Sequence, residues 1–150
     1  YGVLPRVMSA ARRLNDGMGD YVANQVIKLM NKKGILVKNS NILLLGITFK
    51  ENCPDIRNTK IVDMVKALKE YELDIDIYDP WVNSSEAELE YGLIPIKELI
   101  QNSYDGIILA VAHEQFKQMT AMEIHTLGKP LHVLYDLKYA LDKQDSSIRL

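Results

Sequence analysis

The sequence predicts an α/β fold: a Rossmann-like, doubly wound parallel sheet preceded by a long N-terminal helix. Two patterns lead to this prediction. Apolar residues recur at helical spacing along residues 4–29, and from about residue 40 onward short apolar runs alternate with amphipathic stretches. Strands that alternate with helices in this way imply right-handed β-α-β crossovers, which place parallel strands side by side and cover both faces of the sheet.

The first predicted element is a helix that ends near Lys33. Pro5 suits a first helical turn, while Lys33 and the following Gly34 are typical of a helix C-terminus. The spacing predicts one long helix, or two helices that meet near Gly17 and Gly19. The apolar stripe comprises Leu4, Met8, Ala11, Leu14, Met18, Val22, Val26 and Leu29.

Four apolar runs predict the strands of the sheet, at residues 41–47, 74–78, 105–111 and 131–137. Helical patterns lie between them. The first begins near Asn58 or Thr59 and continues to Leu68, and the others cover residues 84–91, 96–100 and 121–127. The polar tail, residues 143–150, is predicted to be frayed.

The composition favours one soluble globular domain and argues against several classes of protein. The 150 residues are 47% hydrophobic and 25% charged, unlike a disordered chain. The 18 basic residues are offset by 20 acidic ones and are scattered, which argues against nucleic-acid binding. Apolar runs fall far short of the roughly 20 residues that span a membrane. Cys53, the single cysteine, can form neither an internal disulfide nor a structural zinc site, so we expect a reducing, cytoplasmic location and no bound metal.

The loop after the first predicted strand, residues 46–57, is the most informative segment. In open α/β sheets this loop usually borders the crevice in which ligands bind. A dinucleotide-binding fold places a G-x-G-x-x-G motif there, but this loop contains only Gly46. We therefore expect that the domain does not hold NAD in the usual way by itself.

Two cations in this loop indicate a phosphate site of another kind. Arg57 follows Lys50 by seven residues, and both lie beside the start of a predicted helix. A lysine reaches one phosphate or ribose oxygen, and an arginine can contact a diphosphate with two parallel hydrogen bonds. The alternative is that both are solvated loop charges partnered by Glu51 and Asp55.

Other residues with reactive side chains receive structural interpretations. Cys53 has no base close to it in the sequence, so we expect no catalytic residue in this chain. His113 follows the third strand at the same edge as the loop, where it serves the site, starts the next helix or contacts solvent. Asp79 either binds a ribose hydroxyl or forms the Asp-Pro turn, and the turn is favoured. His125 and His132 are expected to be structural or exposed.

The segment GITFKENCPDIRNTKIVDMVKALKEYELDIDIYDPWV resembles the C-terminal UDP-binding domain of the UDP-glucose/GDP-mannose dehydrogenase family. In that family a G-x-x-F-K motif is followed, seven residues after the lysine, by an arginine. The stretches FKENCPDIRNT, ARRLNDGMG and VLYDLKYAL are similar to the branch that oxidises UDP-N-acetylglucosamine, so the resemblance covers nearly the whole chain.

The resemblance implies a role for each candidate residue. Phe49 and Lys50 are expected to contact the uridine and the ribose or phosphate of a UDP-sugar, and Arg57 to reach the NAD diphosphate. Lys138 stands where many relatives have the arginine of a D-G-R motif; the sequence YDLK lacks both that glycine and the guanidinium group. The resemblance also implies that residues 1–36 end a central dimerisation domain and that residues 37–150 form the UDP-sugar-binding domain.

The function expected from the resemblance is that of an NAD-dependent nucleotide-sugar 6-dehydrogenase. The full enzyme would oxidise UDP-N-acetylhexosamine or UDP-glucose at C6 to the uronic acid, for surface polysaccharide synthesis, as a homodimer. Its catalytic cysteine would lie upstream of Tyr1, so this chain alone should bind UDP without catalysis. The alternatives are a stand-alone nucleotide-binding sensor, or a dimerisation module with a vestigial pocket.

Overall fold

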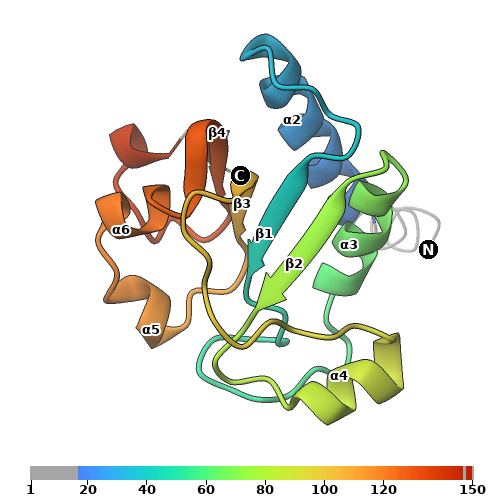
Figure 1. Ribbon diagram of the computed structural model, residues 1–150. Helices are drawn as coiled ribbons and strands as arrows, with labels where there is room; N and C mark the ends of the chain where they lie inside the picture. The colour runs from blue at the N-terminus through green and yellow to red at the C-terminus, as the bar shows by residue number, and fades with distance from the viewer. Residues whose placement is uncertain (1–16, 147, 150) are drawn as a thin grey trace, which may run out of the picture.

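A five-stranded parallel sheet forms the centre of the molecule (Figure 1). The computed structural model describes residues 17–146, 148 and 149. The strand order is β2-β1-β3-β4-β5, so the chain reverses its direction across the sheet between β1 and β3. The strands are β1 (Asn41–Leu45), β2 (Asp74–Tyr78), β3 (Tyr104–Leu109), β4 (Gly128–Asp136) and β5 (Ile148–Arg149).

Helices cover both faces of the sheet, and on each face a separate apolar core lies between the helices and the sheet (Figure 1). The helices are α2 (Met18–Lys32), α3 (Ile61–Lys69), α4 (Ser84–Tyr91), α5 (Glu114–Lys117) and α6 (Ala121–His125), with a 3-10 turn η1 (Lys143–Asp145). Side chains alternate along β1, so Ile42 and Leu44 join the core under α2 and α3, while Leu43 and Leu45 join the core under α5 and α6.

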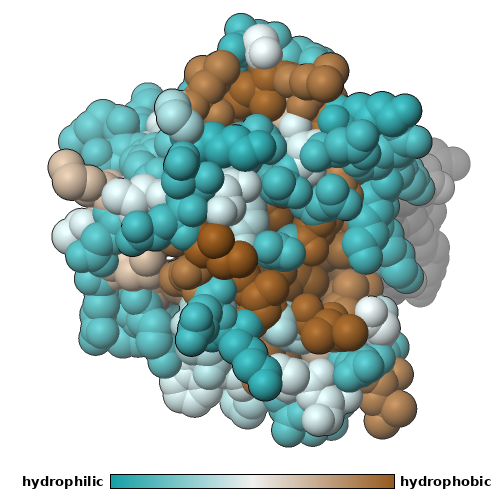
Figure 2. Space-filling view, in the orientation of Figure 1, coloured by the Kyte–Doolittle hydropathy of each residue, from teal (hydrophilic) through white to brown (hydrophobic). Residues whose placement is uncertain are grey.

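Helices α2 and α3 pack closely because Gly19 carries no side chain. A Cβ atom at Gly19 would lie 2.8 Å from the backbone nitrogen of Met64, closer than real Cβ contacts come. The approach brings the first turn of α2 beside α3 and buries Val22, Val26 and Met30 between the helices and the sheet. Figure 2 shows a mainly hydrophilic surface, with apolar residues exposed across the middle of this face and over the end occupied by α2.

The predicted α/β fold is confirmed, and several element boundaries agree with the sequence. Strand β2 and helix α4 have the predicted limits. The limits of α4 follow from its ends: Asn83 accepts a hydrogen bond from Glu86 N–H at the start, and Gly92 ends the helix in a left-handed conformation. Strand β1 stops at Leu45, before the predicted residue 47, because the chain turns at Gly46. The predicted helix across residues 1–16 lies outside the described residues, and α2 ends at Lys32.

Two predictions for local structure are wrong. Residues 96–100 are not helical: Ile96 donates its N–H to Ile77 O at 2.7 Å, and Ile96 and Leu99 pack against the core from an irregular segment. A five-residue pattern is weak evidence for a helix, and here the backbone N–H of Ile96 is used by Ile77 instead. The tail is not frayed throughout, because η1 forms and β5 pairs in parallel with β4. Within the described residues, no helix is long and apolar enough to cross a membrane.

Candidate functional site

A pocket of about 560 Å³ lies beyond the carboxyl ends of β1, β3 and β4. It lies where the strand order reverses between β1 and β3, the usual position of ligand sites in open α/β sheets. Residues from six parts of the chain line it: Met18 and Gly19, residues 48–51, residues 58–61, Met64, residues 110–112, and Leu137 with Lys138. Parts of the chain that are remote in sequence therefore converge on one cavity.

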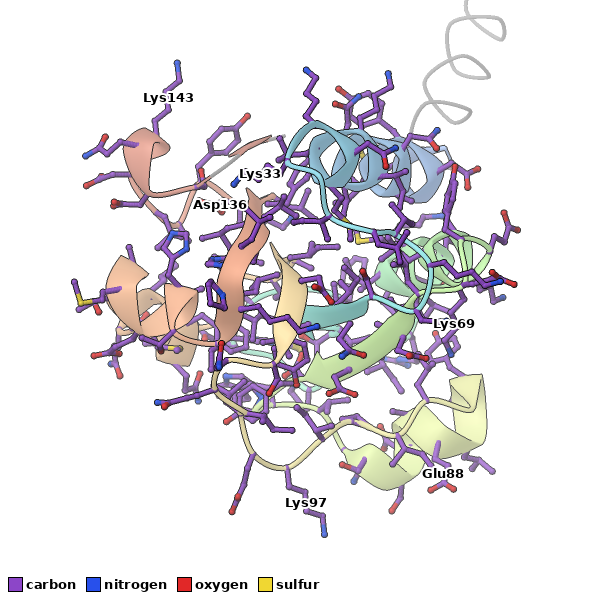
Figure 3. All side chains as sticks on the ribbon, turned by 45° about the horizontal axis from the view of Figure 1, so that its top comes forward. Lys33, Lys69, Glu88, Lys97, Asp136 and Lys143 are labelled. Atoms are coloured by element: carbon purple, nitrogen blue, oxygen red, sulfur yellow. The ribbon has the colours of Figure 1, made fainter. Side chains whose placement is uncertain are left out.

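Three of the four residues predicted to bind ligand line this pocket. Phe49 and Lys50 come from the loop after β1, and Lys138 comes from the turn after β4. The Phe49 side chain is exposed, with 57% of its surface accessible, so an aromatic face is available at the pocket. Lys97 and Lys143 lie elsewhere: Figure 3 shows both projecting away from the body of the molecule.

Arg57, the fourth predicted residue, lies outside the pocket lining and pairs with Asp55. Its Nε atom donates to Asp55 Oδ1 at 3.0 Å and its second guanidinium nitrogen donates to Oδ2 at 3.1 Å. The hydrogen bond from the Arg57 side chain holds the pKa of Asp55 below its usual value. The partner expected in the alternative interpretation is thus present for Arg57, whereas Glu51 pairs with Lys117 at 3.7 Å.

The loop after β1 leaves the sheet through a turn that only glycine allows. Gly46 has φ of 98°, in the left-handed region, and a Cβ atom there would lie 2.5 Å from Val111 Cβ. The contact brings the ends of β1 and β3 together. Gly46 therefore serves close packing at the switch point of the sheet and is the only part of a glycine motif in this loop.

Asp79 fixes the first residues of the loop from the end of β2. Its Oδ2 atom accepts hydrogen bonds from the N–H groups of Ile47 at 2.7 Å and Thr48 at 3.2 Å. Its Oδ1 atom accepts from Trp81 N–H at 2.8 Å and Val82 N–H at 3.2 Å, which forms the predicted turn. The buried carboxylate is saturated and does not line the pocket, so it is not placed to bind a ribose hydroxyl.

The charge on Asp79 is retained despite its burial. Burial by itself raises the pKa of this carboxyl group, but hydrogen bonds from His113 and from the backbone of Ile47 and Trp81 outweigh it, so the pKa is lowered overall. The ionised carboxylate therefore acts as an acceptor for every donor around it. Two strands and the loop that leads to the pocket are tied to this one side chain.

His113 is fully buried against Asp79 and the loop. Its Nε2 atom lies 3.0 Å from Asp79 Oδ2 and 3.1 Å from Thr48 Oγ1, and its Nδ1 atom accepts the Asn52 N–H at 2.9 Å. His113 also starts α5, one of the three predicted alternatives, because its carbonyl accepts from Phe116 N–H at 2.9 Å. It does not line the pocket, so any functional role must act through its neighbours.

Asp136 performs the same task at the end of β4, where Figure 3 labels it. This fully buried carboxylate accepts hydrogen bonds from the N–H groups of Lys138 at 3.2 Å, Ala140 at 3.2 Å and Leu141 at 2.8 Å. The turn it closes presents Lys138 to the pocket. In this chain the D-L-K sequence thus contributes a structural aspartate and a pocket lysine two residues later.

Lys60 is a pocket residue that the sequence reasoning missed. It is the residue before α3, and Thr59 beside it is held by a hydrogen bond of 2.8 Å from its hydroxyl to Ile47 O. Ile61, the first residue of α3, also lines the pocket, so the positive end of the helix dipole borders it. A lysine at the N-terminal end of a helix is unfavourable unless an anion lies nearby. The place of Lys60 just before a predicted helix was therefore the sequence signal that could have identified it.

Comparison with known proteins then identifies the family. The model described as "UDP-glucose/GDP-mannose dehydrogenase family, UDP binding domain" matches residues 43–143. The chain belongs to the UDP-glucose/GDP-mannose dehydrogenase family. It is 56% identical over 149 residues to a UDP-N-acetyl-D-glucosamine 6-dehydrogenase of Salmonella typhi, and 54% identical to one of Pseudomonas aeruginosa. In each case the match covers 99% of this chain and 35% of the relative, so the chain spans about a third of their length.

Solved structures of nucleotide-sugar dehydrogenases share the fold. The crystal structure of an NDP-N-acetyl-D-galactosaminuronic acid dehydrogenase from Methanosarcina mazei Go1 superimposes with a TM-score of 0.80 at 20% identity, over 91% of this chain and 28% of that one. A UDP-glucose dehydrogenase from Pyrobaculum islandicum gives a TM-score of 0.71 at 21% identity, over 94% of this chain and 31% of that one. At this identity the likeness establishes the architecture alone.

The UDP-binding-domain match includes most of the pocket but not all of it. Loop residues 46–57 and Lys138 fall within residues 43–143, whereas Met18 and Gly19 at the start of α2 precede them. Cys53, half-buried in the loop, is absent from the pocket lining. Two residues of α2 that line the pocket therefore lie outside the matched residues.

Proposed function

We propose that this chain is the C-terminal part of an NAD-dependent UDP-sugar 6-dehydrogenase and that its pocket binds the UDP moiety of a UDP-N-acetylhexosamine. The observation that carries the proposal is the convergence of Phe49, Lys50 and Lys138 on one cavity from loops almost ninety residues apart. A pocket of about 560 Å³ is within the ~300–1,000 Å³ range of small-molecule sites.

The charges around the pocket suit a diphosphate. Lys50, Lys60 and Lys138 supply three cations, and the N-terminus of α3 adds its partial positive charge. The acidic residue in the lining, Glu51, is engaged by Lys117 at 3.7 Å. A diphosphate carries its negative charge in a compact group that several lysines can reach together, which favours this ligand over a neutral sugar or a peptide.

Phe49 supplies the surface for the base. Its exposed ring lies next in sequence to Lys50, so a base stacked on the ring would place its ribose and phosphates near the lysines. Stacking of a base on an aromatic side chain is worth about 1–3 kcal/mol and does not by itself select the base. The preference for uridine is supported by the match to the UDP-binding-domain family.

Nicotinamide cofactor chemistry is not assigned to this chain. The described residues do not fit a dinucleotide on their own. The loop after β1 contains a single glycine, Gly46, and the side chain of Val111 packs directly against it. Arg57 is proposed to face the NAD diphosphate of the full-length enzyme. Its exposed guanidinium group would leave the ion pair with Asp55 and bind the cofactor instead. Hydride transfer and thiol chemistry belong to the part of the enzyme outside these residues.

The wider assignments rest on the relatives. We propose that residues 1–36 end the central domain through which the enzyme forms a homodimer, and that residues 37–150 form the UDP-sugar-binding domain. We also propose a cytoplasmic enzyme that supplies uronic acids for surface polysaccharides. The close relatives are UDP-N-acetyl-D-glucosamine 6-dehydrogenases of which this chain covers 35%, so the isolated chain should bind UDP compounds without oxidising them.

Calorimetric titration of the chain with UDP, UDP-N-acetylglucosamine and NAD tests the assignment. We expect heat from both uridine compounds and little from NAD. Lys50→Ala should weaken binding of the uridine compounds about tenfold, the effect of removing one charge-assisted contact, whereas Lys97→Ala, outside the pocket, should leave it unchanged. Absence of uridine binding at millimolar concentration would overturn the proposal and favour a dimerisation module.

A further inference from the structure

His113 meets the loop through two nitrogens with opposite roles. Asn52 N–H donates to Nδ1 at 2.9 Å, so Nδ1 must be unprotonated and the ring hydrogen must lie on Nε2. Nε2 faces Asp79 Oδ2 at 3.0 Å and Thr48 Oγ1 at 3.1 Å. The Thr48 hydroxyl itself donates to Lys50 O at 3.0 Å. The hydrogen-bonding pattern therefore specifies one neutral tautomer.

We propose that His113 is a positioning residue for the UDP-binding loop: as a neutral imidazole anchored on Asp79, it holds Asn52 and Thr48 and thereby sets Phe49 and Lys50 at the pocket. This inference rests on the function proposed above. His113 lies outside the pocket lining, so it acts through the backbone on either side of the two ligand-facing residues.

Apart from its hydrogen bonds to Asp79 and His113, the loop makes few contacts that fix its middle residues. Phe49 N–H donates to Asp55 O at 2.7 Å, which closes the loop on itself. Asn52 adopts φ of 55°, a conformation that asparagine tolerates, and its side-chain oxygen accepts Glu114 N–H at 2.8 Å. Both contacts of Asn52 lead to His113 or to the residue after it. A change at His113 is thus transmitted to the middle of the loop.

The surroundings of the ring make its protonation state consequential. Asp79 is the charged group in direct contact with it, at the end of β2, while the rings of Trp81 and Phe116 lie 6.3 and 5.6 Å from the imidazole between ring centroids. The Glu51–Lys117 ion pair joins the loop to α5 farther out. Glu114, next along the chain, contributes its backbone N–H to the loop.

Protonation of His113 would place a hydrogen on Nδ1, opposite the Asn52 N–H. Two donors cannot share that contact, so the central anchor of the loop would be lost while the contact with Asp79 remained. A hydrogen on Nδ1 would therefore release the middle of the loop from His113. A histidine that only filled space in the core would show no such link between its protonation and the loop.

Two substitutions separate the nitrogens. The side-chain oxygen of asparagine can occupy the position of Nδ1, and the amide nitrogen of glutamine the position of Nε2. We expect His113→Asn to keep most of the affinity for UDP-N-acetylglucosamine, and His113→Gln to lose about tenfold, one hydrogen bond to a structured backbone group. A space-filling role predicts the opposite order, because glutamine is closer to histidine in size. That order, or equal affinities, overturns the proposal.

Hydrogen exchange keeps the inference testable without a ligand. The Asn52 amide should exchange faster in His113→Gln than in the unsubstituted protein or in His113→Asn, with amides of β1 unchanged in all three. If the unsubstituted protein fails to bind uridine nucleotides but Asn52 responds in this way, the proposed function fails and the positioning contact stands. Equal exchange of Asn52 in all three proteins overturns the inference itself.

Discussion

The imidazole rings of His125 and His132 meet head-on. Nδ1 of His125 lies 2.7 Å from Nε2 of His132, and the ring centroids are 5.0 Å apart, about that distance plus the two ring radii, so the nitrogens lie along the line between the rings. Each outer nitrogen faces a carbonyl: Asp145 O at 2.5 Å and Lys129 O at 2.6 Å. Carbonyls only accept, so both outer nitrogens carry hydrogen.

This pair makes stability depend on pH. Burial lowers the pKa of His132, the positive charges of His125 and Lys33 lower it further, and the hydrogen bond to Lys129 O opposes them without reversing the shift. The unfolded chain takes up a proton near pH 6.5, whereas folded His132 resists it. Stability should therefore fall as the pH drops through and below about 6.5. Urea unfolding across this range should show a shallower fall in His132→Gln, and an identical fall would contradict the argument.

Asp79→Asn should destabilise the fold more than any surface carboxylate substitution. The change removes the buried charge that faces His113 and four backbone N–H donors. We expect the free energy of unfolding to fall by about 2 kcal/mol or more, because donors would be left without a full acceptor. Asp74→Asn, at an exposed position of β2, is the matched control and should change stability by less than about 0.5 kcal/mol.

The lowered pKa of Asp79 gives this prediction a pH signature. A carboxyl group whose pKa is depressed by folding contributes stability above its unfolded value, and that contribution is lost as the pH falls through the folded value. The gap between the unsubstituted protein and Asp79→Asn should accordingly narrow below about pH 4. Guanidinium unfolding curves at neutral and acid pH measure the gap, and a gap that widens at low pH would argue against an ionised Asp79.

Gly46→Ala tests the close approach between β1 and β3. Alanine would adopt an unfavourable φ of 98° and would also place its Cβ 2.5 Å from Val111 Cβ. Gly34→Ala is a matched control, since Gly34 has φ of 77° with open space around it. Both should lose stability from strain, about 1–2 kcal/mol, and Gly46→Ala should lose more and also weaken UDP binding. Equal losses in thermal unfolding would show that the Val111 contact relaxes freely.

Features set by local sequence could be predicted, and features set by distant pairing could not. Helix α4 is bounded by its own Asn83 cap and Gly92, and both signals lie within the segment. The contact between Asp79 and His113 joins residues 34 apart, and no spacing in the sequence reveals it. Strand β5 is only two residues long and exists because β4 lies beside it, so the polarity of the tail misled the prediction.

The same distinction applies to the pocket. Phe49 and Lys50 could be predicted from their motif and from their place after the first strand, and Lys138 could be predicted from its position in YDLK. Lys60 was missed because it belongs to no motif considered, and its placement depends on how α3 is set against the sheet. Burial of both carboxylate oxygens of Asp79 decides between turn and ribose contact, which composition and spacing could not do.

Lys138 offers a direct test of whether a lysine serves where the family resemblance implies an arginine. Lys138→Gln should weaken UDP-N-acetylglucosamine binding about tenfold, because it removes one cation from the pocket. Lys138→Arg should bind a few-fold tighter, since a guanidinium group can contact a diphosphate through two nitrogens. Lys143→Gln, on η1 and outside the pocket, removes the same charge and should leave calorimetric affinity unchanged.

The contrast among these three proteins separates a local contact from a general electrostatic effect. If Lys138→Gln and Lys143→Gln weaken binding equally, net charge and not the pocket accounts for the loss, and raising the salt concentration should abolish both effects. If Lys138→Arg binds more weakly than the unsubstituted protein, the turn closed by Asp136 is built for the shorter reach of lysine. In that case the D-L-K sequence differs from a D-G-R motif by a single adaptation at two positions. The shape of the turn and the charged group that it presents would have to change together.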